Sequence, residues 1–155
     1  MTYSKIEDLE LFLRKCENEL LINEKNRKKI DYPIDKINDW LSDDIKKSNK
    51  LLLEEIARET NVYAIFLANK NSDEYKAVYV GQTKSSGART RLTNHLIKKH
   101  PKTGAKLDNV VEHIKNGGSI KVAFISTKPE SLRHYIEEEL IKKYSKTLIW
   151  NIHSK

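Results

Sequence analysis

The sequence has few residues that cross-link or divide a chain. Cysteine occurs once in 155 residues, at Cys16, which excludes an intramolecular disulfide and a thiolate-rich zinc site. A chain without disulfides suits a reducing compartment, so we expect a cytoplasmic protein. No internal repeat or low-complexity linker interrupts the sequence, and its length allows one domain, with or without an extension.

Long hydrophobic runs are also absent. The longest stretch without a charged residue, from Thr60 to Asn69, is far shorter than the roughly 18 apolar residues that cross a membrane. The N-terminus carries Glu7, Asp8 and Glu10, which is unlike a signal or transit peptide. We therefore expect no membrane among the partners of this protein.

Positive charge is present in excess, and all of the excess lies in the second part of the chain. Residues 1–59 hold 12 Lys and Arg against 14 Asp and Glu, whereas residues 60–155 hold 17 against 8. The resulting net charges of −2 and +9 make up the +7 of the whole chain. Lys and Arg that neutralise phosphates release condensed counterions, so this asymmetry favours a polyanionic partner. A Lys-rich solvated surface is the alternative that charge alone leaves open.

Residues 1–59 are predicted to form a helical N-terminal extension. A capping-box pattern at Ser4 and Glu7 precedes apolar residues at helical spacing as far as Leu20. Pro33 is expected to open a short helix toward Trp40, and a third helix is expected over residues 42–58. Such an extension would cover the next domain or form a dimer, and a groove-contacting arm is the alternative.

Residues 60–155 are predicted to form a second unit of the α+β class. Two apolar runs separated by turn residues, 62–67 and 77–80, indicate an antiparallel hairpin. A third strand is expected over 120–125, with helices over 88–99 and 106–115 and another after a capping-box pattern at Thr127 and Glu130. The prediction is a small, three-stranded, mostly antiparallel sheet flanked by helices.

Five short motifs follow one another along this second part. Asn61-Val62-Tyr63 and Tyr79-Val80-Gly81 place two tyrosines sixteen residues apart on the predicted hairpin. Arg91 with His95 one turn later, Glu137 shortly before Leu140-Ile141-Lys142, and Asn151 after Ile149-Trp150 complete the series. In this order the motifs resemble those of the GIY-YIG nuclease family. The resemblance covers residues 61 to 152, and it implies the GIY-YIG nuclease fold and phosphodiester hydrolysis.

The sequence departs from the family pattern at three places. Asn61 stands where the family has a glycine, which is tolerable if the backbone there has no positive φ. Gln82 stands where some members have a lysine, so Lys76 or Lys84 would have to supply that charge. Extra residues in the turn after the hairpin also leave Arg89 as an alternative to Arg91.

Helical geometry narrows the choice of arginine and glutamate. Arg91 and His95 are four residues apart and therefore share a helix face. Glu137 and Glu139 lie on opposite margins of an apolar helical stripe, while Glu138 points away from it. The spacing to Leu140-Ile141-Lys142 favours Glu137, and Glu139 remains the alternative.

The resemblance implies a role for each site residue. Glu137 would bind one Mg²⁺, for which Mn²⁺ could substitute, because a single carboxylate suits an ion that keeps several waters. Arg91 would donate to the phosphate oxygens. Tyr63 would act as the base, supported by cations or by His95, while Tyr79 orients water or phosphate; the two roles are exchangeable. Asn151 would hydrogen-bond a tyrosine or phosphate within the site. Lys84, Arg89, Lys98 and Lys99 are predicted to contact nucleic acid.

Together these features predict a Mg²⁺-dependent DNA endonuclease that is site-specific and restriction-like. An enzyme with one site per chain cuts both strands as a homodimer, formed through the N-terminal helices or on DNA. A catalytically inert or repair-type nucleic-acid-binding module of the same fold is the main alternative. Two others are a two-carboxylate nuclease built on Glu74-Tyr75-Lys76 and a helical interaction protein acting through residues 1–59.

Overall fold

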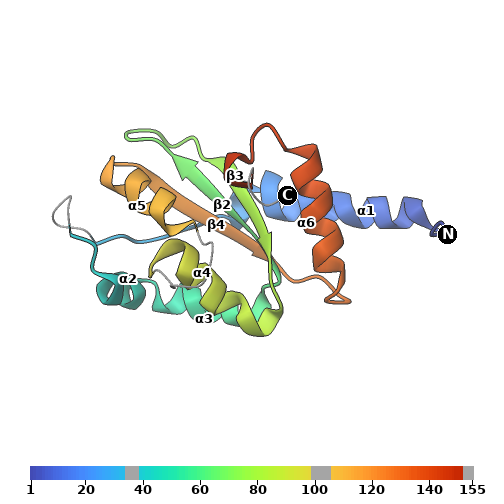
Figure 1. Ribbon diagram of the computed structural model, residues 1–155, viewed down its shortest axis with the longest axis horizontal. Helices are drawn as coiled ribbons and strands as arrows, with labels where there is room; N and C mark the ends of the chain where they lie inside the picture. The colour runs from blue at the N-terminus through green and yellow to red at the C-terminus, as the bar shows by residue number, and fades with distance from the viewer. Residues whose placement is uncertain (34–38, 99–105, 152–155) are drawn as a thin grey trace.

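The computed structural model describes residues 1–33, 39–98 and 106–151. Over these residues the chain has an α+β architecture with one four-stranded antiparallel sheet and six α-helices (Figure 1). The strands lie in the spatial order β1-β4-β2-β3, with β2 and β4 at the centre. Their bounds are β1 Lys28–Lys29, β2 Val62–Ala68, β3 Lys76–Gln82 and β4 Ser119–Ile125.

Helices cover both faces of this sheet. The α-helices are α1 Ile6–Glu17, α2 Ser42–Ser48, α3 Lys50–Glu59, α4 Ala88–Leu96, α5 Leu107–Lys115 and α6 Leu132–Lys143. A π-helical turn, η1 (Asn18–Ile22), extends α1, and 3-10 turns lie at η2 (Glu24–Asn26), η3 (Ser85–Gly87) and η4 (Ile149–Asn151). Figure 1 shows α1 running past α6 and projecting beyond the body of the molecule toward the N-terminus.

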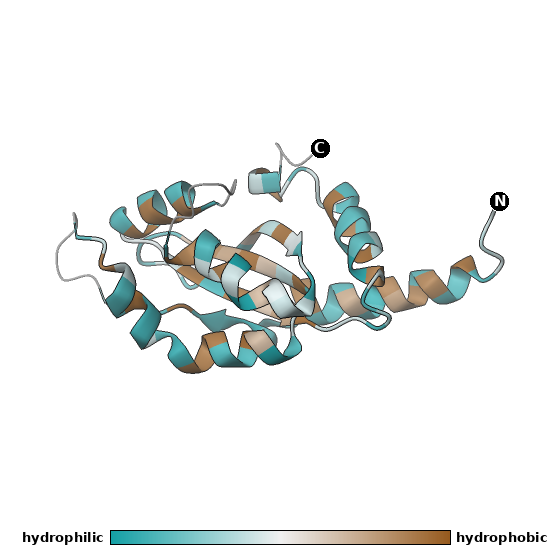
Figure 2. Cartoon of the chain, turned by 60° about the horizontal axis from the view of Figure 1, so that its bottom comes forward, coloured by the Kyte–Doolittle hydropathy of each residue, from teal (hydrophilic) through white to brown (hydrophobic). Residues whose placement is uncertain are grey.

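Two apolar clusters lie on opposite faces of the sheet because side chains alternate along β2. Val62, Ala64 and Phe66 pack toward residues of η1 and α6. Tyr63 and Ile65 pack toward residues of α2 to α5. Covered on both faces, β2 is an almost continuous hydrophobic strand, and Figure 2 shows this brown centre between mixed helices.

The prediction of three strands was wrong, because a fourth strand comes from the first part of the chain. Lys28 pairs with Val122 and Lys29 pairs with Lys121, so β1 lies along β4. Two lysines carry no strand signal of their own, and their pairing depends on where the tertiary structure places them. Residues 1–59 also supply Leu20 to one apolar cluster and Ile56 to the other, so this helical segment shares both clusters with the sheet.

The hairpin and the three later helices agree with the sequence in position. β2 and β3 pair antiparallel, and the register shifts between Ile65 and Phe66, so that Val78 is an extra residue in β3. The helix expected to reach Lys99 ends as α4 at Leu96, and Lys99 and His100 lie outside the described residues. A short helix was expected from Pro33 to Trp40, and residues 34–38 of this segment also lie outside the described residues.

Neither expected capping box forms. α1 follows Lys5 without a side-chain cap. Thr127 bonds to Asn61 instead of capping α6, and the Glu130 carboxylate accepts a bond from the Ser85 main-chain N–H. These side chains tie distant loops together, and a local pattern does not reveal that competition.

The long helix expected over residues 42–58 is divided at Asn49. The Asn49 side chain accepts a hydrogen bond from the Asp31 N–H and donates to the Asp31 and Ile45 carbonyls. The buried asparagine therefore joins the break between α2 and α3 to the segment after β1.

None of the helices within the described ranges is both long and apolar enough to cross a membrane.

Candidate active site

The two motif tyrosines lie side by side on one face of the hairpin. Tyr63 pairs with Gly81 across β2 and β3, and the Tyr63 and Tyr79 ring centroids are 6.2 Å apart. Tyr63 lies across Gly81 so closely that a Cβ added there would be 2.5 Å from the tyrosine Cζ and Oη. Gly81 is therefore needed because the phenol ring occupies the space of a side chain, and the adjacent bulge at Val78 sets the direction of Tyr79.

His95 joins the tyrosines from α4. Its Nε2 lies 2.9 Å from the Tyr63 Oη, and its ring centroid is 5.0 Å from that of Tyr79. Leu92 and Leu96 are buried on the same helix, and they anchor α4 against the sheet. His95 is itself fully buried, and burial together with the charges of Arg91 and Lys106 lowers its pKa to about 3. The imidazole is therefore neutral at pH 7.

Arg91 lies one helical turn before His95 and faces the same group of side chains. Its positive charge lowers the pKa of four neighbouring side chains, which are Tyr63, Tyr79, His95 and Glu137. Arg91 is half-buried, whereas the alternative, Arg89, is exposed. The structure thus brings Arg91 to Tyr63, Tyr79 and His95 and leaves Arg89 on the surface. We call these four residues, with Glu137, the tyrosine cluster.

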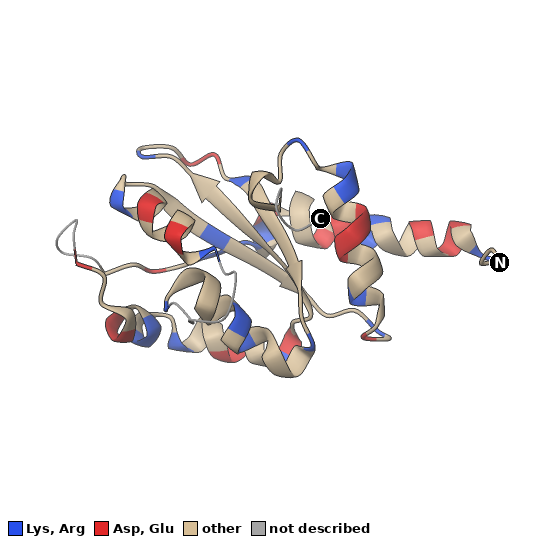
Figure 3. Ribbon diagram, in the orientation of Figure 1, with Lys and Arg blue, Asp and Glu red and all other residues tan. Residues whose placement is uncertain are grey.

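Glu137 reaches the cluster from α6, on the other side of β3. Burial raises the pKa of its carboxyl to about 7; Arg91 opposes that rise and Glu138 adds to it. Glu137 in turn raises the pKa of Tyr79. Glu139 instead pairs with Lys142 at 3.3 Å. Figure 3 shows the acidic residues of α6 and the basic residues of α4 on either side of β3.

The two phenols differ in burial. Tyr63 is completely buried, and desolvation holds its pKa well above the usual value of 10. Tyr79 keeps 6 % of its surface exposed, and desolvation also raises its pKa. Arg91 lowers both pKa values, and Tyr63 also lowers that of Tyr79. Tyr79 is therefore the phenol that lies nearer to solvent, and both of these neighbours favour its ionised form.

Asn151 occupies a different position from the one expected. Its side-chain oxygen accepts a bond from the Val80 N–H at 2.9 Å, and its amide nitrogen donates to the Val80 carbonyl at 2.9 Å. Both polar atoms are thus bound to the outer edge of β3, next to Tyr79. Where a direct bond to a tyrosine or phosphate was expected, Asn151 satisfies backbone groups of an edge strand and thereby positions the neighbouring Tyr79.

Asn61 shows how the chain accommodates its departure from glycine. Among the residues that the structure describes, Asn71 is the non-glycine residue with a positive φ, so Asn61 needs no glycine conformation. Its side chain instead donates to the Thr127 carbonyl and accepts from the Thr127 N–H, both at 2.9 Å. The substitution ties the start of β2 to the loop before α6.

The two lysines expected to stand in for the one absent at Gln82 both lie at the surface. Gln82 itself accepts a hydrogen bond from Arg133. Lys76 and Lys84 are exposed, and the charge of Lys84 lowers the pKa of Glu130. Instead, Lys106 lies beside the cluster, with its Nζ 5.9 Å from the Tyr79 ring centroid. Sequence reasoning missed this residue, because no motif surrounds it and only the fold brings it to His95 and Tyr79.

The remaining candidates lie at the surface or elsewhere. Lys98 is exposed just after α4. Glu74 and Lys76 are exposed, and no group of three or more His, Cys, Asp or Glu able to hold a metal occurs among residues 1–33, 39–98 and 106–151. Of the remaining histidines, His113 bonds to the Ala68 carbonyl and His134 is exposed.

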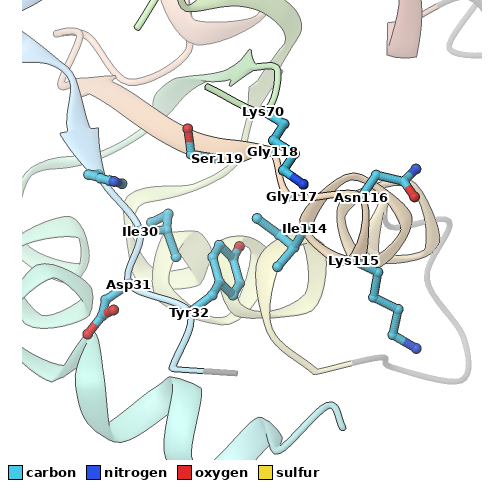
Figure 4. A pocket seen from close by; sticks show the side chains of 11 residues that line it. Ile30, Asp31, Tyr32, Lys70, Ile114, Lys115, Asn116, Gly117, Gly118 and Ser119 are labelled. Atoms are coloured by element: carbon cyan, nitrogen blue, oxygen red, sulfur yellow. The ribbon is translucent and has the colours of Figure 1, made fainter. Parts of the chain in front are cut away.

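A separate cleft lies where the segment after β1 meets the turn between α5 and β4 (Figure 4). It has a volume of about 860 Å³, and Lys29, Tyr32, Lys70, Ile114 and Lys115 are among its lining residues. None of the tyrosine-cluster residues lines it, so this cleft is distinct from the candidate active site.

Comparison with protein families, with curated proteins and with solved structures finds no match to this chain.

Proposed function

We propose that the protein is a divalent-metal-dependent endonuclease of the GIY-YIG type that hydrolyses phosphodiester bonds in DNA. The supporting observation is the convergence of two phenols, a guanidinium and a carboxyl group at the edge strand β3. Tyr63 and Tyr79 come from the hairpin, Arg91 from α4 and Glu137 from α6. Arg91 lowers the pKa of the other three groups, and Glu137 raises that of Tyr79. Shifted pKa values that share charge partners are typical of catalytic sites.

Arg91 is proposed to stabilise the reacting phosphate. Negative charge grows on the phosphate oxygens as water attacks phosphorus, and a guanidinium offers several donors in a fixed plane. Packing of Leu92 and Leu96 holds α4, so Arg91 is oriented before the substrate arrives. Preorganised donors of this kind act mainly on the transition state.

Tyr79 is the better candidate for the proton acceptor, which exchanges the roles first assigned to the tyrosines. A base must reach the attacking water, and Tyr79 is the less buried of the two phenols. Arg91 and the neighbouring Tyr63 both favour its ionised form. Tyr63, fully buried against Gly81 and bound to His95, would then orient Tyr79.

Glu137 fits the role of a metal ligand by its chemistry. It is a half-buried carboxylate whose charge is only partly compensated by Arg91, and such a group gains from a bound cation. One carboxylate suits Mg²⁺, which keeps most of its waters and also binds substrate phosphate. The ion would contribute Lewis-acid stabilisation of the phosphate.

DNA is the proposed substrate because the second part of the chain carries a net charge of +9. Lys84, Arg89 and Lys98 are exposed at or near α4, where they would contact the backbone on either side of the cut. One site in each chain is consistent with a dimer for cutting both strands at a specific sequence, as restriction-like enzymes do.

Incubation of supercoiled plasmid with the protein and Mg²⁺ tests the proposal. We expect discrete fragments from the wild type. Glu137→Ala and Arg91→Ala should each cut at about a hundredth of the wild-type rate or more slowly. Glu139→Ala is the matched control and should cut at nearly the wild-type rate. Nicking or a smear would contradict site-specificity. Plasmid binding without any cutting would contradict the enzyme and support the inert module.

A further inference from the structure

Lys106 touches the candidate active site through two different groups. It directly precedes α5, and its main-chain N–H donates a hydrogen bond to the Nδ1 of His95 at 3.0 Å. Its side-chain Nζ lies over the Tyr79 ring, 5.9 Å from the centroid. One residue thus contacts both aromatic partners of Tyr63.

The main-chain contact decides which nitrogen of His95 carries the proton. A backbone N–H can only donate, so Nδ1 must present its lone pair to Lys106. The ring is neutral because it is fully buried and lies near two cations. A neutral imidazole whose Nδ1 accepts must be protonated at Nε2. This nitrogen lies 2.9 Å from the Tyr63 Oη, so His95 donates to the phenol oxygen.

The direction of this bond determines what Tyr63 can do. Its oxygen accepts from His95, so its own hydrogen is free to point toward another acceptor. Tyr79 is the neighbouring phenol, with its ring centroid 6.2 Å from that of Tyr63, and Tyr63 lowers its pKa. The donors therefore run in one direction, from Lys106 to His95 and from His95 to Tyr63, and the Tyr63 hydrogen is left for the side of Tyr79. His95 is not available to take a proton from Tyr63 in this arrangement.

The ammonium group of Lys106 lies beside Tyr79, the phenol next to Tyr63. A cation over the face of an aromatic ring is attracted to it, and a nearby positive charge favours a phenolate over a phenol. Gln82 offers no charge here, and its side chain is bound to Arg133.

We propose that Lys106 is a positioning residue of this site: its main-chain N–H fixes His95 as the Nε2–H donor to Tyr63, and its ammonium supports Tyr79 in place of the lysine absent at Gln82. The consequence for cleavage rests on the proposed nuclease function. The tautomer of His95 does not, since it is a property of the protein alone.

Nitrogen-15 NMR of the histidine rings tests the tautomer without any substrate. At pH 7, we expect the His95 ring, assigned through its backbone connections, to show a protonated Nε2 and an unprotonated Nδ1. Lys106→Pro removes the N–H at a position before a helix, where proline is tolerated, and should give a mixture of tautomers. Lys106→Ala keeps the N–H and should leave the ring unchanged. A wild-type ring protonated at Nδ1, or at both nitrogens, would overturn the inference.

Cleavage rates test the ammonium. We expect Lys106→Met to cut about tenfold more slowly than Lys115→Met, its control on the same helix, and Lys106→Arg to recover most of the rate. Equal rates for the two methionine variants would refute the ammonium role. If the wild type cuts no DNA, the nuclease proposal fails together with this role, whereas the ring spectrum still decides the main-chain role.

Discussion

The two faces of the same sheet are packed in different ways. On the face covered by η1 and α6, Val62, Ala64 and Phe66 meet apolar partners such as Ile136 and Leu140. On the face covered by α4, adjacent residues of the same strands are equally buried, yet they include the hydroxyls of Tyr63 and Tyr79 and the His95 imidazole. Burial alone therefore does not distinguish a structural core from a candidate site.

The difference lies in how the polar atoms are satisfied. A buried polar group costs free energy unless it is hydrogen-bonded, and His95 has a partner on each ring nitrogen. The polar cluster also lies beside β3, the edge strand, whose outer backbone groups at Val80 are bound by Asn151. The apolar face stabilises the fold, and the polar face holds reactive groups in defined orientations.

The largest effect is expected from a cavity in the apolar face. Ile136→Ala removes a fully buried side chain and should lower the free energy of unfolding by about 3 kcal/mol. Urea denaturation measures the change, with Leu51→Ala as the control because Leu51 is 81 % exposed. The NMR spectrum of the His95 ring should be unchanged. A perturbed ring would mean that the two faces are coupled.

A smaller loss is expected when one hydroxyl is removed from the polar face. Tyr63→Phe leaves the buried His95 Nε2–H without its partner, which should cost about 2 kcal/mol of unfolding free energy. Tyr75→Phe is the control, because its half-buried bond to Ser119 can be replaced by water. If both variants lost the same unfolding free energy, the idea that the polar face pays a larger penalty for an unpaired buried donor would be refuted.

The smallest effect is a pH dependence at the boundary between the faces. The pKa of Glu137 in the folded protein, about 7, is above its ordinary value of 4.5. Between these values the folded state binds more protons than the unfolded state, so this group lowers stability as pH rises. Glu137→Gln removes the effect. Its unfolding free energy should match the wild type near pH 4 and exceed it by about 1 kcal/mol near pH 8, after allowance for screening by solvent.

Urea denaturation across this pH range, without divalent cations, measures the difference. Glu138→Gln is the control, since Glu138 is exposed on the same helix. A constant difference between Glu137→Gln and the wild type at all pH values would show that the Glu137 carboxyl is not desolvated.

Much of the fold was predictable because its signals are local. The continuous apolar run in residues 62–67 and the period of 3.6 in residues 107–115 predicted a strand and a helix that the structure contains. The fourth strand was not predictable, because Lys28 and Lys29 become a strand only through pairing with β4. The side chains of Asn49 and Thr127 bind distant backbone. The helix expected over residues 42–58 is therefore divided, and the capping box expected at Thr127 does not form.

Helical spacing likewise placed Arg91 with His95 and separated Glu137 from Glu138, and the structure brings Arg91, His95 and Glu137 to the tyrosines. It could not identify Lys106, whose contacts with His95 and Tyr79 arise from chain segments that meet only after folding. Nor could it show that Asn151 binds the edge of β3.

The sequence alone determined the α+β class and the types of reactive side chain, because periodicity and chemical identity are properties of neighbouring residues. The tertiary structure decided the number of strands, the burial that separates the two phenols, and the direction of the hydrogen bonds through His95. These depend on desolvation and on donor and acceptor geometry between distant segments, and neither exists until the chain has folded.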